Sequence, residues 1–156
     1  MAAPQPITGV LPAKAWSGVA VDRVLLDYDG RHRRRIVLTG ESGAQYLLDL
    51  PETTHLKGGD GLTLAGGGIL LVVAEPEPLL EVRAASPEAL IRLAWHIGNR
   101  HLAAAIQPDR LLIRRDHVIA HMLEHQGAKV REVEEPFDPE GGAYHDHGPG
   151  DHQHDH

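Results

Sequence analysis

The pattern of apolar and polar positions changes near the middle of the chain. Up to residue 74, short runs rich in Val, Leu and Ile alternate with turns that contain Gly, Asp or Ser. Such runs are typical of β-strands, and frequent glycine turns indicate a small sandwich-like or barrel-like domain. Asp29-Gly30 predicts a type I′ hairpin turn between the first two strands. After an extended, proline-bearing lead-in at 1–18, the predicted strands cover 19–28, 35–39, 45–50, 62–64 and 69–74.

Beyond residue 75 the pattern is mixed. Glu75-Pro76-Glu77-Pro78 predicts an extended linker, because each proline restricts itself and the residue before it. Two amphipathic helices then alternate with strands, and Ser86 and Asp116 are good N-caps for them. The predicted order β-α-β-β-α-β is that of a ferredoxin-like domain. It consists of strands at 79–85, 104–107, 111–114 and 129–133 and helices at 86–99 and 117–127. One face of such a sheet carries no helix, so we expect a partner or a second copy to cover it.

The predicted fold class is therefore α+β. A small all-β N-terminal domain at 1–75 precedes a ferredoxin-like domain at 79–137, which we expect to bind metal and to dimerise. Residues 138–156 form a tail rich in His and Asp with almost no apolar side chains. Because such a segment cannot bury a core, we expect it to be disordered.

Composition excludes several classes of protein and of site. The chain has no cysteine, so it can form neither disulfides nor thiolate metal sites. Its net charge is −7, with five carboxylates and no Lys or Arg after Phe137, which is not the basic balance of a nucleic-acid-binding protein. No stretch approaches the ~20 apolar residues of a membrane span, so we expect a cytoplasmic protein without membrane contact.

The tail gives the strongest compositional signal for chemistry. Imidazole and carboxylate ligands suit Ni(II), Cu(II), Co(II) or Zn(II). Five of the last twelve residues are His, alternating with Asp, Gln, Gly and Pro, which favours a native metal-collecting tail over the uninterrupted run of an expression tag. The candidate ligands in the tail are His145, His147, His152, His154 and His156.

A further candidate ligand follows the first predicted helix. The apolar stripe that begins at Leu90 and passes Ile97 leads one step further to His101, on the buried or partner-facing side. Gly98 and Asn99 disfavour helix, so we expect an irregular helix end there. A histidine at such a place is either a metal ligand or a packed, hydrogen-bonded residue.

The second predicted helix carries His117, His121 and His125, each four residues apart. Two such histidines can chelate one ion, but an exposed polar flank is the favoured interpretation for His121 and His125. His117 differs, because it starts the helix beside Asp116. Residues 121–125 also match H-x-x-E-H, a metalloprotease motif. We regard that match as chance, because the motif needs a third ligand and a much larger fold.

The only basic cluster is Arg31-His32-Arg33-Arg34-Arg35. It could contact an anion or an acidic partner. A solvated hairpin tip is the favoured interpretation, and such charges discourage edge-to-edge strand pairing.

Several motifs together resemble one family. These are Gly98-Asn99-Arg100-His101, then Asp116-His117-Val118, then the segment 136–144 with a His-rich end. With looser matches at Arg34-Arg35, 47–51 and 58–60, the chain resembles the UreE family of urease accessory proteins over nearly its whole length.

The resemblance implies a nickel metallochaperone rather than an enzyme. Its cargo would be Ni(II), with Cu(II), Zn(II) or Co(II) able to occupy the same site. It implies a homodimer through the ferredoxin-like domains, in which His101 meets its symmetry mate and is the central ligand. His117 matches one member of an auxiliary histidine pair, but Arg115 stands at the other position and cannot ligate.

The resemblance also implies partners. The N-terminal domain would contact the urease accessory GTPase and the urease apoprotein complex. A protein that stores or buffers Ni, Cu or Zn without a delivery partner is the alternative. His96, His121 and His125 receive no role from the resemblance.

Overall fold

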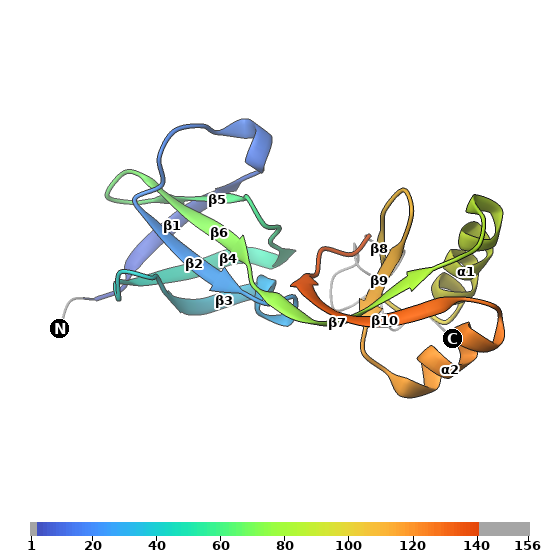
Figure 1. The fold of residues 1–156 in the computed structure, drawn as a ribbon. Coiled ribbons are helices and arrows are strands. Elements are labelled where there is room, and N and C mark those ends of the chain that lie inside the picture. Colours follow the sequence, from blue (N-terminus) through green and yellow to red (C-terminus); the bar gives the residue numbers. More distant parts are fainter. Residues whose placement is uncertain (1–2, 141–156) are drawn as a thin grey trace. The chain divides into compact units, whose positions relative to one another are not determined.

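The computed structural model describes residues 3–140, and the chain divides into two compact units, 1–75 and 76–156 (Figure 1). Unit 1 contains strands and short 3-10 turns, whereas unit 2 combines a sheet with two α-helices. The predicted α+β class is confirmed by these elements. None of the helices in the described part of the chain is long and apolar enough to cross a membrane.

Unit 1 is a six-stranded sheet with the order β2-β6-β5-β1-β4-β3. The pairs β1–β4 and β2–β6 are parallel, and the other neighbours are antiparallel. Its core is aliphatic and includes the fully buried Leu48, Leu62 and Leu70. The strands are β1 (Gln5–Leu11), β2 (Asp22–Leu26), β3 (His32–Thr39), β4 (Gln45–His55), β5 (Gly61–Leu64) and β6 (Ile69–Ala74), and the 3-10 turns are η1 (Ala13–Ala15) and η2 (Asp29–Arg31).

Two expectations for unit 1 are wrong. The lead-in contains β1, an inner strand between β5 and β4. The hairpin at Asp29-Gly30 does not form, because β2 pairs with β6 and the 3-10 turn η2 replaces the type I′ turn. A type I′ turn needs positive φ at both central residues, and neither residue has it. Instead, the backbone N–H of Gly30 donates to the Asp27 carboxylate at 2.7 Å.

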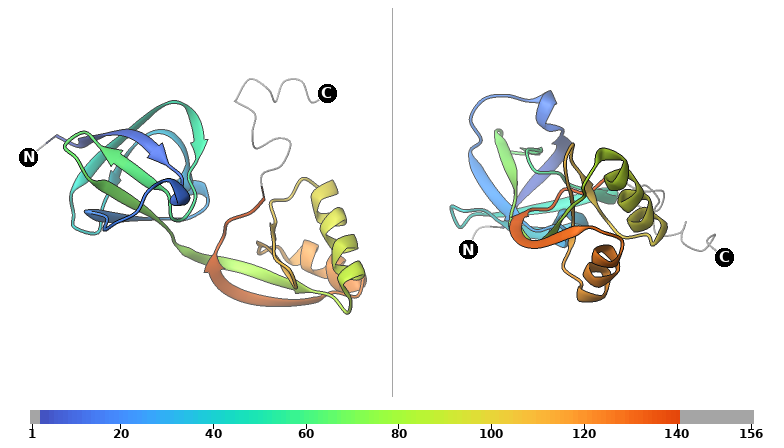
Figure 2. Two further views of the ribbon diagram at one scale, coloured as in Figure 1. Left: turned by 90° about the horizontal axis from the view of Figure 1, so that it is seen from above. Right: turned by 45° about the vertical axis from the view of Figure 1, so that its right-hand side comes forward.

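Unit 2 has the element order β-α-β-β-α-β and an antiparallel sheet with the order β10-β7-β9-β8. Both helices lie on one side of this sheet (Figures 1 and 2). Leu93 and Ile97 of α1 and Leu123 of α2 form the core with Leu80 and Val82 of β7. The elements are β7 (Pro76–Arg83), α1 (Pro87–Asn99), β8 (Ala105–Ile106), β9 (Leu111–Arg114), α2 (His117–His125) and β10 (Lys129–Pro136).

The two helix starts are confirmed, whereas the linker is not. The Ser86 hydroxyl accepts from the N–H of Ala89 at 3.1 Å, and the Asp116 carboxylate caps α2. Pro76 and Pro78, however, belong to β7 and pair with β10. Both prolines are tolerated because β9 joins β7 only from Leu79 onward, so the missing N–H groups cost no ladder hydrogen bond on that side.

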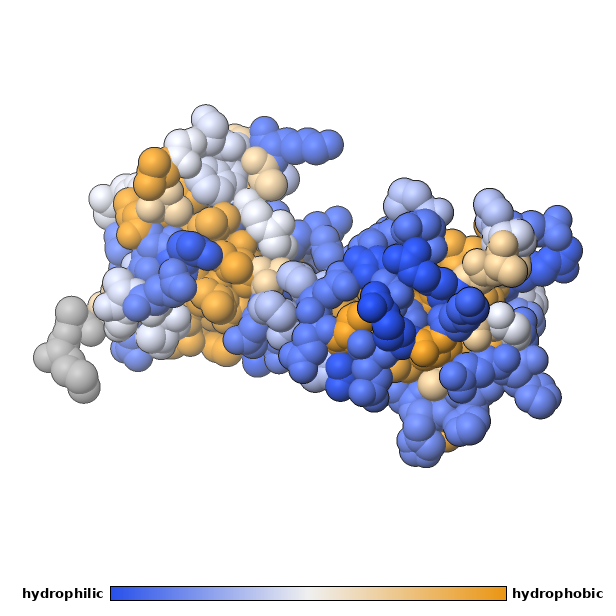
Figure 3. All heavy atoms as spheres, viewed as in Figure 1, coloured by the Kyte–Doolittle hydropathy of each residue, from blue (hydrophilic) through white to orange (hydrophobic). Residues whose placement is uncertain are grey.

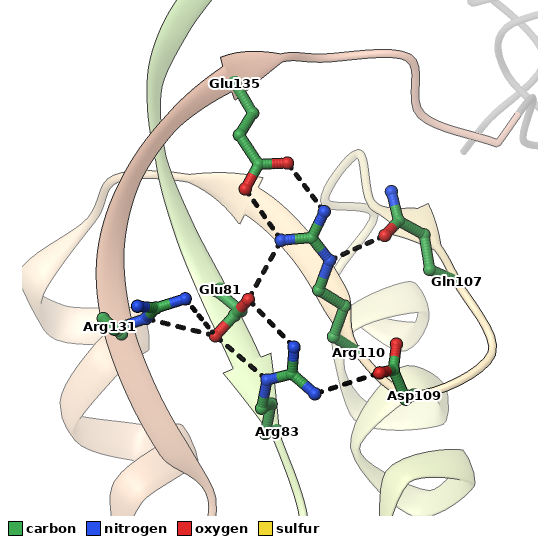
Figure 4. Close-up of polar contacts among 7 residues, drawn as sticks. All are labelled: Glu81, Arg83, Gln107, Asp109, Arg110, Arg131 and Glu135. Carbon is green, nitrogen blue, oxygen red and sulfur yellow. Dashed lines mark hydrogen bonds and ion pairs between the residues drawn. The ribbon is translucent and has the colours of Figure 1, made fainter.

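The sheet face without helices is partly covered by the chain itself. Leu79 and Leu112 lie on that face and are 0% and 1% exposed. Phe137, directly after β10, is 0% exposed. An ion-pair network around Glu81 occupies the same face (Figure 4). The sequence reasoning expected a partner to cover this face, but much of the cover comes from within unit 2.

Candidate metal centre

His101 lies just beyond the end of α1. The helix ends at Asn99, and the N–H of His101 donates to the Gly98 carbonyl at 2.9 Å. The φ of His101 is +61°, a left-handed conformation that no other non-glycine residue adopts within 3–140. Histidine is among the residues that tolerate this conformation, and Gly98-Asn99 correctly predicted an irregular helix end. The side chain is exposed, because the chain leaves the helix before the apolar stripe reaches residue 101.

The solvent-facing side of α1 exposes large apolar side chains close to His101 in sequence. Ile91 is 69% exposed and Trp95 64% exposed, and the two are one helical turn apart. They line a shallow hollow with Arg92 and His96. The His96 ring meets the Trp95 ring edge-on, with centroids 5.2 Å apart. A monomer gains nothing from this arrangement, and such apolar surface is typical of an interface.

The α2 histidines are exposed and are not gathered into a site. His117, His121 and His125 all face solvent. The Asp116 carboxylate accepts the N–H groups of Val118 and Ile119 at 2.9 and 3.1 Å, so it serves as the helix cap. Over residues 3–140, no group of three or more His, Asp or Glu side chains is placed to hold a metal ion. Neither an auxiliary site at His117 nor a protease-like site at 121–125 is therefore assembled from these residues.

Arg115 occupies the position where the resemblance expects a second histidine. Its guanidinium donates to the Leu79 carbonyl at 3.1 Å and to the Val133 carbonyl at 2.9 Å, and it lies 3.9 Å from Glu132. The side chain therefore clamps β7 to β10. This structural role of Arg115 could not be predicted from the sequence, because both carbonyls lie far from it along the chain.

The tail histidines lie outside the described residues. This applies to His145, His147, His152, His154 and His156. The structure consequently describes one predicted ligand, His101, at the helix end and a second, His117, on α2.

Sequence reasoning missed a polar network on the sheet face opposite the helices (Figure 4). Glu81 is 3% exposed and accepts from Arg83 at 3.1 Å and Arg110 at 2.9 Å, while Arg131 approaches within 3.1 Å. Arg110 also forms a bidentate pair with Glu135. The signal was a carboxylate, Glu81, inside the apolar run 79–82 of β7.

These contacts fix the charge of the network. Hydrogen bonding from Arg83, supported by Arg110 and by the charge of Arg131, outweighs burial and lowers the pKa of Glu81 to about 2. The hydrogen bond with Arg110 likewise lowers the pKa of Glu135, and the same pairing raises the pKa of Arg110. Within the network the charges are mutually satisfied, so it is a structural element rather than a cation site.

The basic cluster of unit 1 is largely engaged within unit 1. Arg31 is 0% exposed and donates to the Leu56 carbonyl at 3.3 Å. Arg35 pairs with Asp49 at 2.6 Å, and Arg34 donates to the Leu50 carbonyl at 3.2 Å. The predicted hairpin tip does not form, because Arg34 and Arg35 lie within the edge strand β3, where their charges discourage edge-to-edge pairing.

Unit 1 nevertheless exposes apolar side chains. Figure 3 shows hydrophobic surface on this unit in the view of Figure 1. The exposed apolar residues include Val19, which is 96% exposed, and Val21, Leu25 and Val37.

Comparison with known proteins accounts for both units. The UreE urease accessory protein N-terminal domain matches residues 7–75, and its C-terminal domain matches residues 77–156. The chain is 56% identical over 137 residues to the urease accessory protein UreE of Bradyrhizobium sp. (strain ORS 278), covering 88% of this chain and 65% of that protein. It is 50% identical over 147 residues to that of Rhodobacter capsulatus, covering 90% and 91%.

A third relative has the same name. The urease accessory protein UreE of Ruegeria sp. (strain TM1040) is 61% identical over 123 residues, which cover 79% of this chain and 68% of that protein. The chain thus spans 65% of the length of the Bradyrhizobium relative, just under two thirds, and 91% of that of Rhodobacter capsulatus. The chain belongs to the UreE urease accessory protein family.

Proposed function

We propose that this protein is a metallochaperone for urease maturation, which binds Ni(II) through His101 and delivers it to the urease apoprotein complex. The observation that carries the proposal is the position of His101: exposed, at a helix end, in a left-handed conformation, within a chain of the UreE family. A neutral imidazole is a suitable ligand for Ni(II).

A homodimer completes this proposal. The exposed Ile91 and Trp95 of α1 favour association of unit 2 with a second copy. A twofold axis near His101 would bring two imidazoles to one ion. Two protein ligands leave a first-row ion open to further donors, so the ion can be exchanged rather than held permanently.

The tail supplies those further donors in this proposal. Tethered imidazoles act at roughly millimolar effective concentration. We assign to this role the five tail histidines, and His117 as an accessory ligand outside the central site. Cu(II), Zn(II) and Co(II) can occupy the same ligands, and because Cu(II) binds such ligands more tightly, selectivity for Ni(II) must come from geometry and supply.

Calorimetry with Ni(II) tests the proposal. His101→Ala should weaken the tightest nickel site about 100-fold or more, because even loss of a residue that only supports a ligand costs 10–100-fold. The matched control is His125→Ala, another exposed histidine of unit 2, which should bind as the unaltered protein does. Unchanged affinity in His101→Ala would refute the assignment. Binding through imidazoles should also weaken as the pH falls through about 6.5.

Storage of metal is the second candidate, favoured by the density of histidine in the tail. The two functions differ in whether the bound metal is passed on to another protein. A chaperone loaded with nickel should activate urease apoprotein together with the accessory GTPase, in proportion to the metal supplied, whereas a storage protein should retain its metal. We propose that unit 1, with its exposed Val19, Val21, Leu25 and Val37, makes the contact with these partners.

A further inference from the structure

The segment after β10 crosses the sheet of unit 2. β10 is one edge of this sheet and β8 is the other, so three strand spacings, roughly 14 Å, separate them. Four residues beyond Pro136, the N–H of Glu140 donates to the carbonyl of Ala104, next to β8, at 2.9 Å. This hydrogen bond brings residue 140 to the edge of the sheet opposite β10. Figures 1 and 4 show this segment turning back from the end of β10.

Phe137 fixes the crossing. It is the only phenylalanine of the chain and is 0% exposed. The guanidinium of Arg114, on the helix-free face at the end of β9, lies 6.0 Å from its ring centroid. The neighbouring Leu79 and Leu112 of the same face are buried as well. Burial of the phenylalanine side chain removes apolar surface from water and so favours this position of the segment over a solvated one.

The crossing ends close to His101. Ala104 is three residues from His101, so the two backbones are at most ~11 Å apart. His145 is five residues from Glu140 and can extend at most ~18 Å from it. If the chain left the sheet directly after β10, the tail would begin at the edge opposite β8.

We propose that Phe137 and the Glu140–Ala104 hydrogen bond form an anchor that sets the origin of the histidine-rich tail beside His101 of the same chain. Phe137 is thus a positioning residue for metal capture. The proposal rests on the proposed function, because it assumes that His101 and the tail share Ni(II).

The length of the tether gives the expected effect. Release of the anchor lengthens the tether to His145 from five residues to nine and moves its origin across the sheet. Because effective concentration falls at least as the −3/2 power of tether length, the nickel affinity of the His101 site should fall about twofold or more.

Matched variants isolate the anchor. Glu140→Pro removes the backbone donor, and Glu140→Ala removes the same side chain but keeps the donor. Phe137→Ala removes the buried ring, and Phe137→Leu keeps an apolar anchor. Nickel calorimetry should show about twofold or more weakening in Glu140→Pro and Phe137→Ala, and little in their controls. When residues 145–156 are also deleted, the two variants of each matched pair should bind nickel with equal affinity.

Distance measurement tests the anchor without metal. The chain lacks cysteine, so Arg100→Cys and Ala143→Cys provide the only two thiols for spin labels in each chain. Labelled chains diluted with unlabelled protein should give one short, narrow distance distribution in the Glu140→Ala background. The distribution should become longer and broader in the Glu140→Pro background.

Three outcomes would overturn the anchor. The first is equal nickel affinity in the members of each pair. The second is weakening that persists after deletion of 145–156, which would indicate a local effect on His101. The third is identical distance distributions in both backgrounds. The proposed function fails separately, through unchanged nickel binding in His101→Ala.

Discussion

Unit 1 and unit 2 each bury a carboxylate in a sheet, but they satisfy it in different ways. In unit 1, Asp22 accepts from the hydroxyls of Ser42 at 2.5 Å and Tyr46 at 2.7 Å. Two backbone N–H groups, of Arg23 and Ser42, complete the set. In unit 2, Glu81 is surrounded by three arginines. Neutral donors hold the first carboxylate and cations hold the second.

The positions of the two carboxylates explain the difference. Asp22 begins the edge strand β2 and ties it to the turn after β3, where Glu41 also donates its N–H to the Arg23 carbonyl. Hydroxyls and backbone groups of that turn are within reach. Glu81 lies mid-strand on a face without helices, where long side chains from β9, β10 and their loops must cover the sheet. Arginine provides both apolar length and charge for that purpose.

Both carboxylates remain ionised, although the balance of causes differs. Burial raises the pKa of Asp22, but hydrogen bonds from Ser42, Tyr46 and the backbone outweigh it and lower the pKa to about 2. Burial, together with its hydrogen bond to Asp22, raises the pKa of Tyr46. For Glu81, the hydrogen bond from Arg83 is itself larger than the effect of burial. Neutral hydrogen-bond donors therefore lower the pKa of Asp22 much as three arginines lower the pKa of Glu81.

The largest expected effect comes from Glu81→Ala. It leaves three arginines without their shared partner, which should lower the free energy of unfolding of unit 2 by about 3–5 kcal/mol. Each unit contains one tryptophan, Trp16 in unit 1 and Trp95 in unit 2. Urea unfolding followed by fluorescence in a Trp16→Phe background therefore reports on unit 2. A loss below about 1 kcal/mol would show that the network is not needed for stability.

A smaller effect is expected from Asp22→Asn. The amide places a donor where the site presents only donors, so unit 1 should lose about 1–3 kcal/mol of unfolding free energy. A Trp95→Phe background makes Trp16 the reporter. Ser42→Ala is the control, because it removes one donor and leaves the carboxylate with its other partners. If Asp22→Asn cost less than Ser42→Ala, the carboxylate would not be what the turn requires.

Lowering the pH should reduce the unfolding free energy of each unit by less than these substitutions do, until the pH approaches the lowered pKa values of the two carboxyls. The pKa of each carboxyl is lowered on folding, so its stabilisation is present above the unfolded pKa and is lost as the pH falls toward about 2. The ordinary pKa from which this loss begins is 4.5 for Glu81 and 3.8 for Asp22. Urea midpoints measured from pH 7 to pH 3.5 should therefore fall earlier for unit 2. An earlier fall for unit 1 would contradict this order.

The smallest effect is expected from Glu88→Gln. Glu88 pairs with Arg92 at 3.6 Å on α1, and the two side chains are 80% and 73% exposed. An exposed pair of this spacing contributes less than about 0.5 kcal/mol. The unfolding free energy of unit 2 should therefore hardly change, in contrast to Glu81→Ala. A loss comparable with that of Glu81→Ala would mean that burial is not what separates the two ion pairs.

Part of the candidate site was predictable because its signals are local. Gly98 and Asn99 predicted the irregular end of α1, and the family motif selected His101. The exposure of His101 was not predictable from the apolar stripe, because the stripe assumes that the helix continues. The clamp formed by Arg115 depends on two strands, around Leu79 and Val133, that are distant in sequence.

The same distinction holds for the fold. The sequence by itself determined the helix caps at Ser86 and Asp116, the β-α-β-β-α-β order and the family, because these depend on neighbouring residues and on motifs. Only the tertiary structure decided that β2 pairs with β6, that Pro76 and Pro78 lie in a strand, and that Phe137 covers the free face of a sheet. Each of these is a contact between distant segments, where the partner, and not the local propensity, supplies the hydrogen bonds and the burial.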